Sequence, residues 1–265
     1  MSFRRLGKFM VLAVILLSVG AFATIAYATH SWGGYHWTRN TNPLNLNLGD
    51  NVSTVWDGHL TTASTDWSTT SASTSAVLNT TIVAGGSKRN CGPIKGRVEV
   101  CNKTYGNNGW LGVAQIWVSG SHITQGVTKM NDTYFNTAPY NTPAWRQFVM
   151  CQEIGHTFGL DHQDEIFNNA NLGTCMDYTS DPTTNQHPNT HDYDQLGIIY
   201  QHLDALTSSL GKKSPTPASV GDDIDTSDEK EWGKVIKKSG DGRSSLHERD
   251  LGKGNKLFTF VIWAN

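Results

Sequence analysis

Three stretches of the chain place apolar residues at helical spacing. In the first stretch, such residues follow one another at steps of four, four, three and four: Val52, Trp56, Leu60, Ala63 and Trp67. This spacing predicts a helix over residues 51–67 with one buried face. Its serines and threonines are weak helix formers, so packing of the two tryptophans must outweigh intrinsic propensity. A Ser/Thr-rich linker is the alternative, although a linker has no reason to keep this apolar register.

Two further helices are predicted in the second half of the chain. The first covers residues 145–159, with Pro143 just before it, where a helix tolerates proline. The second covers residues 191–206 and carries tyrosines and leucines at helical spacing: Tyr193, Leu196, Tyr200 and Leu203. Both helices follow the part of the chain in which strand patterns dominate.

Short strands are predicted around the first helix. Residues 31–50 fit an opening strand and turn, and the segments 81–84 and 96–101 are β-branched or alternate apolar with polar residues. The segment 111–118, LGVAQIWV, is almost continuously apolar, which is typical of a strand covered on both faces or lying beside a cleft. Because strands and one helix precede two later helices, we expect the α+β fold class.

The composition changes beyond Gly211. Residues 212–232 are polar and charged and contain Pro and Ser, which is typical of a linker. The chain then ends in LFTFVIW (Leu257–Trp263), a strong strand signal. We therefore expect a main domain over 29–210 and a linker with a C-terminal β segment over 211–265. The pattern leaves open whether this segment is a hairpin docked on the main domain or a small accessory module.

The first 28 residues have the pattern of a signal peptide. A basic start precedes an apolar run over 9–23, and Ala26-Tyr27-Ala28 offers a cleavage site between small residues. We expect cleavage before Thr29 and a secreted, extracellular mature protein. The alternative is an uncleaved membrane anchor, because residues 9–28 just reach the roughly 20 residues that a spanning helix needs. A membrane contact is expected only in that case.

Length and charge describe an ordinary globular protein. The 265 residues are 37% hydrophobic and carry a formal net charge of −2, which suits one substantial domain with an appendage. Lysine and arginine are dispersed, and no basic stripe alternates with aromatic residues. We therefore expect no nucleic-acid partner, and we expect a monomer.

The stretch CQEIGHTFGLDH carries the chemistry. It matches the zinc-binding pattern H-E-x-x-H-x-x-G-x-x-H except at the first position, where Gln152 stands. On a helix, Gln152 and His156 lie one above the other, and Glu153 projects beside them, where it can polarise a water held by a metal. Gly159 lets the chain leave the helix through a left-handed conformation, which turns His162 back toward the same metal.

This stretch resembles the zinc helix of the metzincin metalloproteases. TCMDY (Thr174–Tyr178) resembles their Met-turn, with Met176 beneath the metal. YHWTRNTNPLNLNLGDNVSTVWDGHL resembles the start of a matrixin-like catalytic domain, and the similarity extends over residues 35–206. The resemblance implies a twisted, mostly parallel sheet with an antiparallel edge strand, a long metal-binding helix, the Met-turn and a C-terminal helix. It also implies Zn²⁺ as cofactor and a peptide or protein as substrate.

Gln152 departs from the family pattern. Its amide oxygen is a neutral, hard donor and a poorer zinc ligand than imidazole. Together with His156 and His162 it would still leave a fourth coordination position open, as a catalytic zinc requires. A spare histidine is the alternative third ligand, and no spacing argument selects among the available ones: His122, His187 and His191.

Tyr178 is a second candidate for the chemistry. In astacin- and serralysin-like metzincins, a tyrosine two residues after the Met-turn methionine can bind zinc or hydrogen-bond the oxyanion. By this resemblance Tyr178 is a catalytic candidate, and a buried structural tyrosine is the alternative. The resemblance also implies that substrate pairs with an edge strand above the zinc helix, for which Gly112, Val113 and Ala114 are the candidates.

The cysteines form two pairs that are local in sequence. Cys91 is close to Cys101 and Cys151 is close to Cys175, so we expect these two disulfides in an exported protein. A zinc site built from the four cysteines is the weaker alternative, because no C-x-x-C pair exists. A Cys151–Cys175 disulfide would join the predicted zinc helix to the Met-turn.

These patterns predict a secreted zinc metalloendopeptidase, a hydrolase that cleaves peptide bonds with Glu153 as general base. His156, His162 and Gln152 would hold the metal, so the site is one histidine short of the pattern and otherwise whole. Domain-like sequence already starts at Tyr35, so we expect either a protease made without a latency segment or one held back by something outside this chain. The alternative is a catalytically inactive metzincin-fold protein that is secreted or surface-bound and binds another molecule.

Overall fold

The structure, a computed structural model, describes residues 29–69, 77–86, 90–204 and 224–264. The predicted signal peptide lies outside these residues. Within the described ranges, no helix is both long and apolar enough to cross a membrane.

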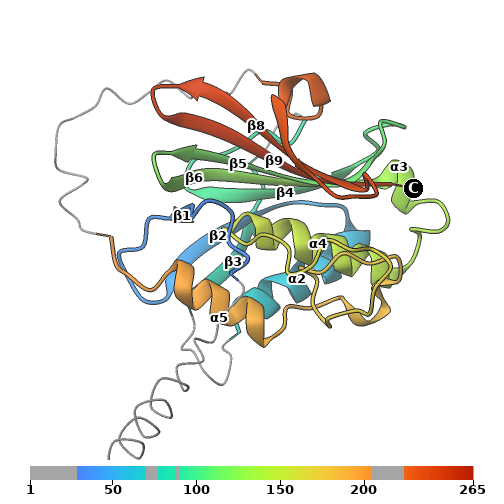
Figure 1. The fold of residues 1–265 in the computed structure, drawn as a ribbon, viewed down its shortest axis with the longest axis horizontal. Coiled ribbons are helices and arrows are strands. Elements are labelled where there is room, and N and C mark those ends of the chain that lie inside the picture. The colour runs from blue at the N-terminus through green and yellow to red at the C-terminus, as the bar shows by residue number, and fades with distance from the viewer. Residues whose placement is uncertain (1–28, 70–76, 87–89, 205–223, 265) are drawn as a thin grey trace, which may run out of the picture.

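Nine strands in the described part of the chain form one sheet, with helices packed against one of its faces (Figure 1). The strands are β1 (His36–Trp37), β2 (Leu44–Asn51), β3 (Leu78–Ala84), β4 (Arg97–Lys103), β5 (Trp110–Ser119), β6 (His122–Asn131), β7 (Lys234–Lys238), β8 (Ser244–Gly252) and β9 (Asn255–Trp263). The α-helices are α2 (Thr54–Trp67), α3 (Asp132–Phe135), α4 (Pro143–His156) and α5 (Thr190–Ile199), and short 3-10 helices cover Pro182–Thr184 and Glu229–Glu231. This arrangement confirms the α+β class.

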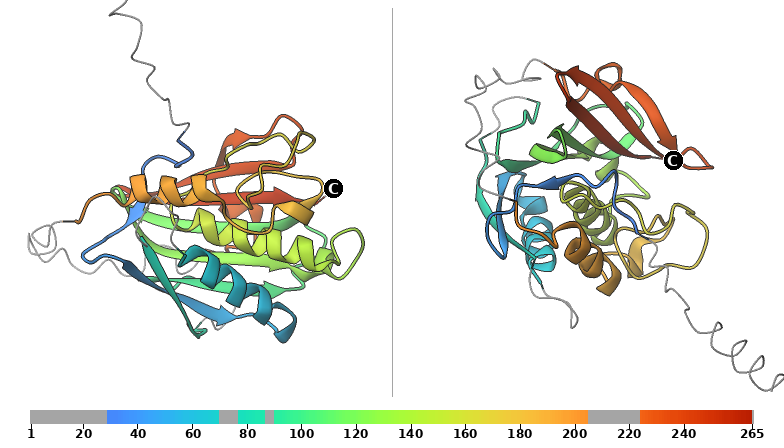
Figure 2. Two further views of the ribbon diagram at one scale, coloured as in Figure 1. Left: turned by 90° about the horizontal axis from the view of Figure 1, so that it is seen from below. Right: turned by 60° about the vertical axis from the view of Figure 1, so that its left-hand side comes forward.

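The predicted helices form for the expected reason. In α2, the side chains that are buried include Trp56, Leu60 and Trp67, which lie on the face predicted from their spacing. The indole nitrogen of Trp67 donates a hydrogen bond to the Cys151 carbonyl oxygen at 3.1 Å, so α2 packs directly on α4. α5 ends at Ile199 and is thus shorter than the predicted helix over 191–206. Seen from below, the helices cover the sheet on this one side (Figure 2).

The sheet has a parallel half and an antiparallel half. Its order is β3-β2-β4-β6-β5-β9-β8-β7, and β1 also pairs with β6. β1, β2, β3, β4 and β6 are mutually parallel, and β5 is antiparallel to β6. β5 is therefore antiparallel, as predicted, but the prediction that it is an edge strand is wrong. β9 pairs with its outer side, and β8 and β7 follow. The sheet is mixed rather than mostly parallel.

The C-terminal β segment is docked on the main domain and continues its sheet. Phe258, Phe260 and Ile262 of β9 alternate along the strand and join the same hydrophobic core as α4. The predicted linker over 212–232 is packed at its end, where the Trp232 side chain is fully buried. An unpaired β5 edge would leave backbone donors and acceptors exposed, and pairing with β9 satisfies them.

Two strands carry too few apolar residues to be predicted from sequence. β6 has the sequence HITQGVTKMN and β8 has the sequence SSLHERDLG. β6 is nonetheless buried from Gly126 onward, because strands lie on both of its sides. Its polar residues are held by side-chain hydrogen bonds, as in the case of Asn131, which bonds to backbone and side-chain atoms of residues 105–110.

Candidate metal centre

Helix α4 presents the residues of the zinc-like pattern. The Thr142 hydroxyl accepts a hydrogen bond from the Trp145 amide at 3.2 Å and caps the helix start. Gln152, Glu153 and His156 lie in the last turns of the helix and are all buried. Burial of these polar side chains is costly unless each one is paired or binds a ligand.

A glycine then turns the chain, as predicted. Gly159 has φ +100°, and a side chain there would collide with the Tyr35 carbonyl oxygen. The turn brings His162 beside His156, with 3.0 Å between their Nε2 atoms. The two histidines that are six residues apart in sequence therefore converge on one point.

The Nδ1 atoms of His156 and His162 each face an oxygen acceptor. The Leu160 carbonyl oxygen lies 2.8 Å from His156 Nδ1, which must donate to it. His162 Nδ1 lies 3.3 Å from Asp161 Oδ1 and 3.8 Å from Glu165 Oε1. Both Nε2 atoms can thus present lone pairs to each other, and lone pairs at this distance repel unless a cation or a proton lies between them. Tetrahedral zinc with bonds of about 2.0–2.1 Å separates two nitrogen ligands by roughly 3.3 Å, so the pair fits this ion.

In the part of the chain that the structure describes, the side-chain amide of Gln152 makes a hydrogen bond through its nitrogen but not through its oxygen. Its Nε2 donates to the Cys175 carbonyl oxygen at 2.8 Å, which links α4 to the Met-turn. Its Oε1 is buried and has no hydrogen-bond partner among the described residues. An unsatisfied buried oxygen costs about 1–3 kcal/mol, and a metal ligand would remove that cost. Two imidazoles and one amide oxygen are donor types that zinc accepts, although an amide oxygen is a poorer zinc ligand than a third imidazole.

The side chain of Glu153 projects from α4 against β5. A side chain at Gly112 would come within 2.7 Å of Glu153 Oε1, so the glycine leaves room for the carboxyl group. Glu153 Oε2 is buried and without a partner in the described structure, and burial raises the pKa of Glu153 well above its usual range. The carboxyl group therefore lies against the strand predicted to bind substrate, and it projects from the same helix as His156.

The Met-turn packs under the helix. Both predicted disulfides, Cys91–Cys101 and Cys151–Cys175, form in the structure, and the second joins α4 to this turn. Met176 is fully buried, and a side chain at Gly155 would come within 2.6 Å of its sulfur. The helix and the turn are thus in direct contact and covalently joined, as expected.

Tyr178 lies beside the histidines. Its ring centroid is 3.9 Å from that of His162, and its other face stacks on Phe167 at 4.5 Å. It lines the same cavity as Ser244, and burial raises the pKa of Tyr178 well above its usual range. The neutral phenol can therefore donate a hydrogen bond at this site.

The spare histidines have other neighbours. His187 Nδ1 lies 2.7 Å from Asp66 Oδ2, and the His191 ring stacks on His30 at 4.7 Å. His122 Nε2 lies 3.2 Å from Asp204 Oδ1. The structure therefore brings none of the three to the pair formed by His156 and His162.

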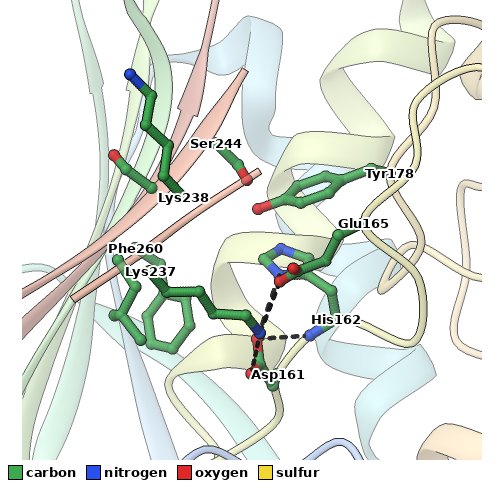
Figure 3. Close-up of a pocket in the computed structure, with 10 residues that line it drawn as sticks. Asp161, His162, Glu165, Tyr178, Lys237, Lys238, Ser244 and Phe260 are labelled. Atoms are coloured by element: carbon green, nitrogen blue, oxygen red, sulfur yellow. Dashed lines mark hydrogen bonds and ion pairs between the residues drawn. The ribbon is translucent and has the colours of Figure 1, made fainter. Parts of the chain in front are cut away.

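The C-terminal β segment covers the site (Figure 3). The Phe260 ring stacks on the His156 ring with 4.1 Å between centroids and 10° between planes. Lys237 Nζ lies 2.9 Å from Asp161 Oδ2 and 2.7 Å from Glu165 Oε1, which are the carboxylates beside His162. The cavity left between these groups has a volume of about 10 Å³, enough for about one water.

The candidate substrate strand is occupied by the same segment. Gly112, Val113 and Ala114 are register partners of Ile262, Val261 and Phe260. The prediction that these residues form a free edge is therefore wrong, because β9 lies antiparallel on it. The covering element belongs to the chain itself.

Four residues of this site were not predicted: Asp161, Glu165, Lys237 and Phe260. Two of them had a signal in the sequence, because the acidic residues of LDHQDE flank His162 and carboxylates commonly orient metal-binding histidines. Lys237 and Phe260 lie far along the chain, and no spacing connects them to α4. Only the pairing of β9 with β5 brings them there.

No protein-family model matches the sequence, and no curated protein matches it significantly. The resemblance to metzincins therefore depends on the residues of the site and their geometry.

Proposed function

We propose that this protein is a secreted zinc-dependent endopeptidase of the metzincin type. The observation that carries the proposal is the convergence of His156 and His162, whose Nε2 atoms lie 3.0 Å apart. Glu153 and Gln152, whose side-chain oxygen has no partner among the described residues, lie on the same helix as His156. Such a set of side chains is costly to bury in a protein that holds no cation.

His156, His162 and the amide oxygen of Gln152 would hold the ion. When bound, zinc supplies the Lewis acidity that makes a water nucleophilic and polarises the scissile carbonyl group. Glu153 would act as the general base, accepting a proton from the attacking water and passing it to the departing amine. Tyr178 can donate its hydroxyl proton in a hydrogen bond to the oxygen on which negative charge develops.

The substrate would be an extended peptide paired with β5. Backbone pairing with a sheet edge gives affinity without strict sequence preference. In the described conformation β9 occupies this edge and Phe260 covers His156. We infer that the described form is closed and that a peptide reaches Glu153 only after β9 leaves β5.

The alternative is a non-catalytic protein of the same fold. One observation favours it: β9 pairs with β5 from Trp110 to Ser119, and Phe260 is part of the hydrophobic core. In that case the segment never leaves, and the buried polar residues of α4 are retained for stability or for metal binding alone.

The test compares zinc binding and hydrolysis of fluorogenic peptides for the full chain and two variants. Glu153→Ala should bind zinc as the unchanged protein does and hydrolyse nothing. Gln152→His should bind zinc about tenfold more tightly or better, because imidazole replaces an amide oxygen. The enzyme proposal is rejected if the unchanged protein neither binds zinc at His156 nor cleaves peptides, while Gln152→His both binds zinc and cleaves them.

A further inference from the structure

A second group of histidines surrounds one carboxylate, away from α4. His36 lies on β1 and His122 lies at the start of β6, and the two are register partners in these parallel strands. Asp204 follows α5, and its Oδ1 lies 3.7 Å from His36 Nε2 and 3.2 Å from His122 Nε2. A third histidine, His202, has its Nε2 3.5 Å from the same oxygen. Three separate segments of the chain thus direct ring nitrogens at one oxygen atom.

The tautomer of His36 leaves a lone pair facing this carboxylate. His36 Nδ1 lies 3.0 Å from the Gly34 carbonyl oxygen, to which it must donate. Its Nε2 is buried and has no hydrogen-bond partner within the described ranges. In neutral His36 a lone pair is buried opposite a carboxylate oxygen, which is unfavourable, and a cation or a proton between the two atoms would remove the repulsion.

The carboxylate is also held in a fixed orientation. Asp204 Oδ2 accepts a hydrogen bond from the Arg39 amide at 2.6 Å, and the Asp204 amide donates to the Arg39 carbonyl oxygen at 2.8 Å. This leaves Oδ1 for the histidines. Ligands whose far atoms are anchored to backbone groups are a common property of metal sites in proteins.

The spacing and the donor types fit zinc. One nitrogen or oxygen ligand of tetrahedral zinc lies roughly 3.3–3.5 Å from the next, given bonds of about 2.0–2.2 Å. The ligand atoms of His36, His122 and Asp204 all lie within 4.8 Å of one another, and Asp204 Oδ1 is 3.2 Å from His122 Nε2 and 3.7 Å from His36 Nε2. His202 is half-exposed, and its Nε2 lies 3.5 Å from the same carboxylate oxygen, which makes it the candidate for the fourth ligand.

We propose that His36, His122 and Asp204, completed by His202, form a second zinc site with a structural role. This site does not depend on peptidase activity. It would tie β1 to β6 and to the chain after α5. The segment next to it holds the end of α4, because the Trp32 indole donates to the His156 carbonyl at 3.2 Å and the Trp37 indole donates to the Thr157 carbonyl at 2.8 Å. The ion would thus stabilise the N-terminal segment that packs on the candidate metal centre.

The test is a zinc titration of the full chain after removal of metal with a chelator, followed by thermal unfolding. His122→Gln and Asp204→Asn should each bind one equivalent of zinc fewer than the unchanged protein and lose the gain in Tm that this equivalent gives. His187→Gln is the matched control, because His187 also faces a carboxylate but has no second histidine beside it. It should bind as much zinc as the unchanged protein.

Two results would overturn the site. One is an unchanged zinc stoichiometry in both His122→Gln and Asp204→Asn, with both proteins folded. The other is that a combined His122→Gln and His156→Ala variant binds as much zinc as His156→Ala alone. The zinc lost in His122→Gln would then belong to the centre at His156 and His162. Loss of one further equivalent in the combined variant supports the proposal even if the protein hydrolyses no peptide.

Discussion

At the scale of single residues, the site follows from local spacing. The offsets of Gln152, His156, Gly159 and His162 lie within three helical turns and one glycine turn, so sequence was sufficient to place them together. The sequence could not show which amide atom of Gln152 is engaged, because that depends on the Cys175 carbonyl oxygen across the Met-turn. The spare histidines could not be ruled out from sequence for a similar reason, since their partners come from distant segments.

Lys129 gives a prediction about pH that is independent of the metal centre. Its ammonium group is buried on β6 and donates to Thr226 Oγ1 at 2.5 Å and to Ser227 Oγ at 2.9 Å. Burial lowers its pKa to about 7, with Asp225 opposing and Lys103 adding to the shift, and the Tyr105 ring lies 5.6 Å from the nitrogen. In the unfolded chain its pKa is about 10.4.

The free energy of unfolding should depend on pH because the folded protein and the unfolded chain bind this proton with different affinity. Above pH 7 the folded protein releases this proton while the unfolded chain keeps it, so the free energy of unfolding should rise with pH up to about 10. Relative to Lys129→Met, the unchanged protein should gain about 2 kcal/mol between pH 7 and pH 9. Urea unfolding at several pH values measures this, with the exposed Lys238→Met as control. Parallel pH profiles for Lys129→Met and the unchanged protein would contradict it.

At the scale of elements, the pairing of the strands decides what the sequence could predict. Strands with alternating apolar residues, such as β4 and β9, were visible in the sequence. β6 was not, because its burial comes from neighbours on both sides rather than from its own composition. The place of β9 could not be predicted either, since nothing in LFTFVIW specifies β5 as its partner.

The Cys151–Cys175 disulfide should hold the metal site as well as the fold. A Cys151→Ala/Cys175→Ala variant should lose about 3 kcal/mol of stability, as expected for a loop of this length, and should also bind zinc more weakly. The Cys91→Ala/Cys101→Ala variant should lose a similar free energy of unfolding while its zinc affinity is unchanged, because its bridge belongs to a core cluster that contains no residue of α4. Denaturant unfolding and zinc competition measure the two effects. Equal zinc affinities in both variants would contradict the specific role of the first bridge.

At the scale of the whole molecule, the sheet determines access to the site. The main domain presents β5 beside Glu153, and the C-terminal segment extends the sheet over that position through β9 (Figure 1). Phe260 and Lys237 then close the site from one side, by a ring on His156 and by ion pairs with Asp161 and Glu165. The proposed catalysis would therefore require a change in the position of β9.

The most direct measurement is the hydrolysis of fluorogenic peptides by the zinc-loaded full chain with Phe260→Ala, alone and combined with Glu153→Gln. Phe258→Ala is the matched control, because Phe258 lies on the same strand but packs on Trp32 and Tyr35 rather than on His156. We predict that Phe260→Ala cleaves faster than both the unchanged protein and Phe258→Ala. We also predict that adding Glu153→Gln abolishes the cleavage while zinc remains bound. Equal hydrolysis with and without Glu153→Gln would contradict the account.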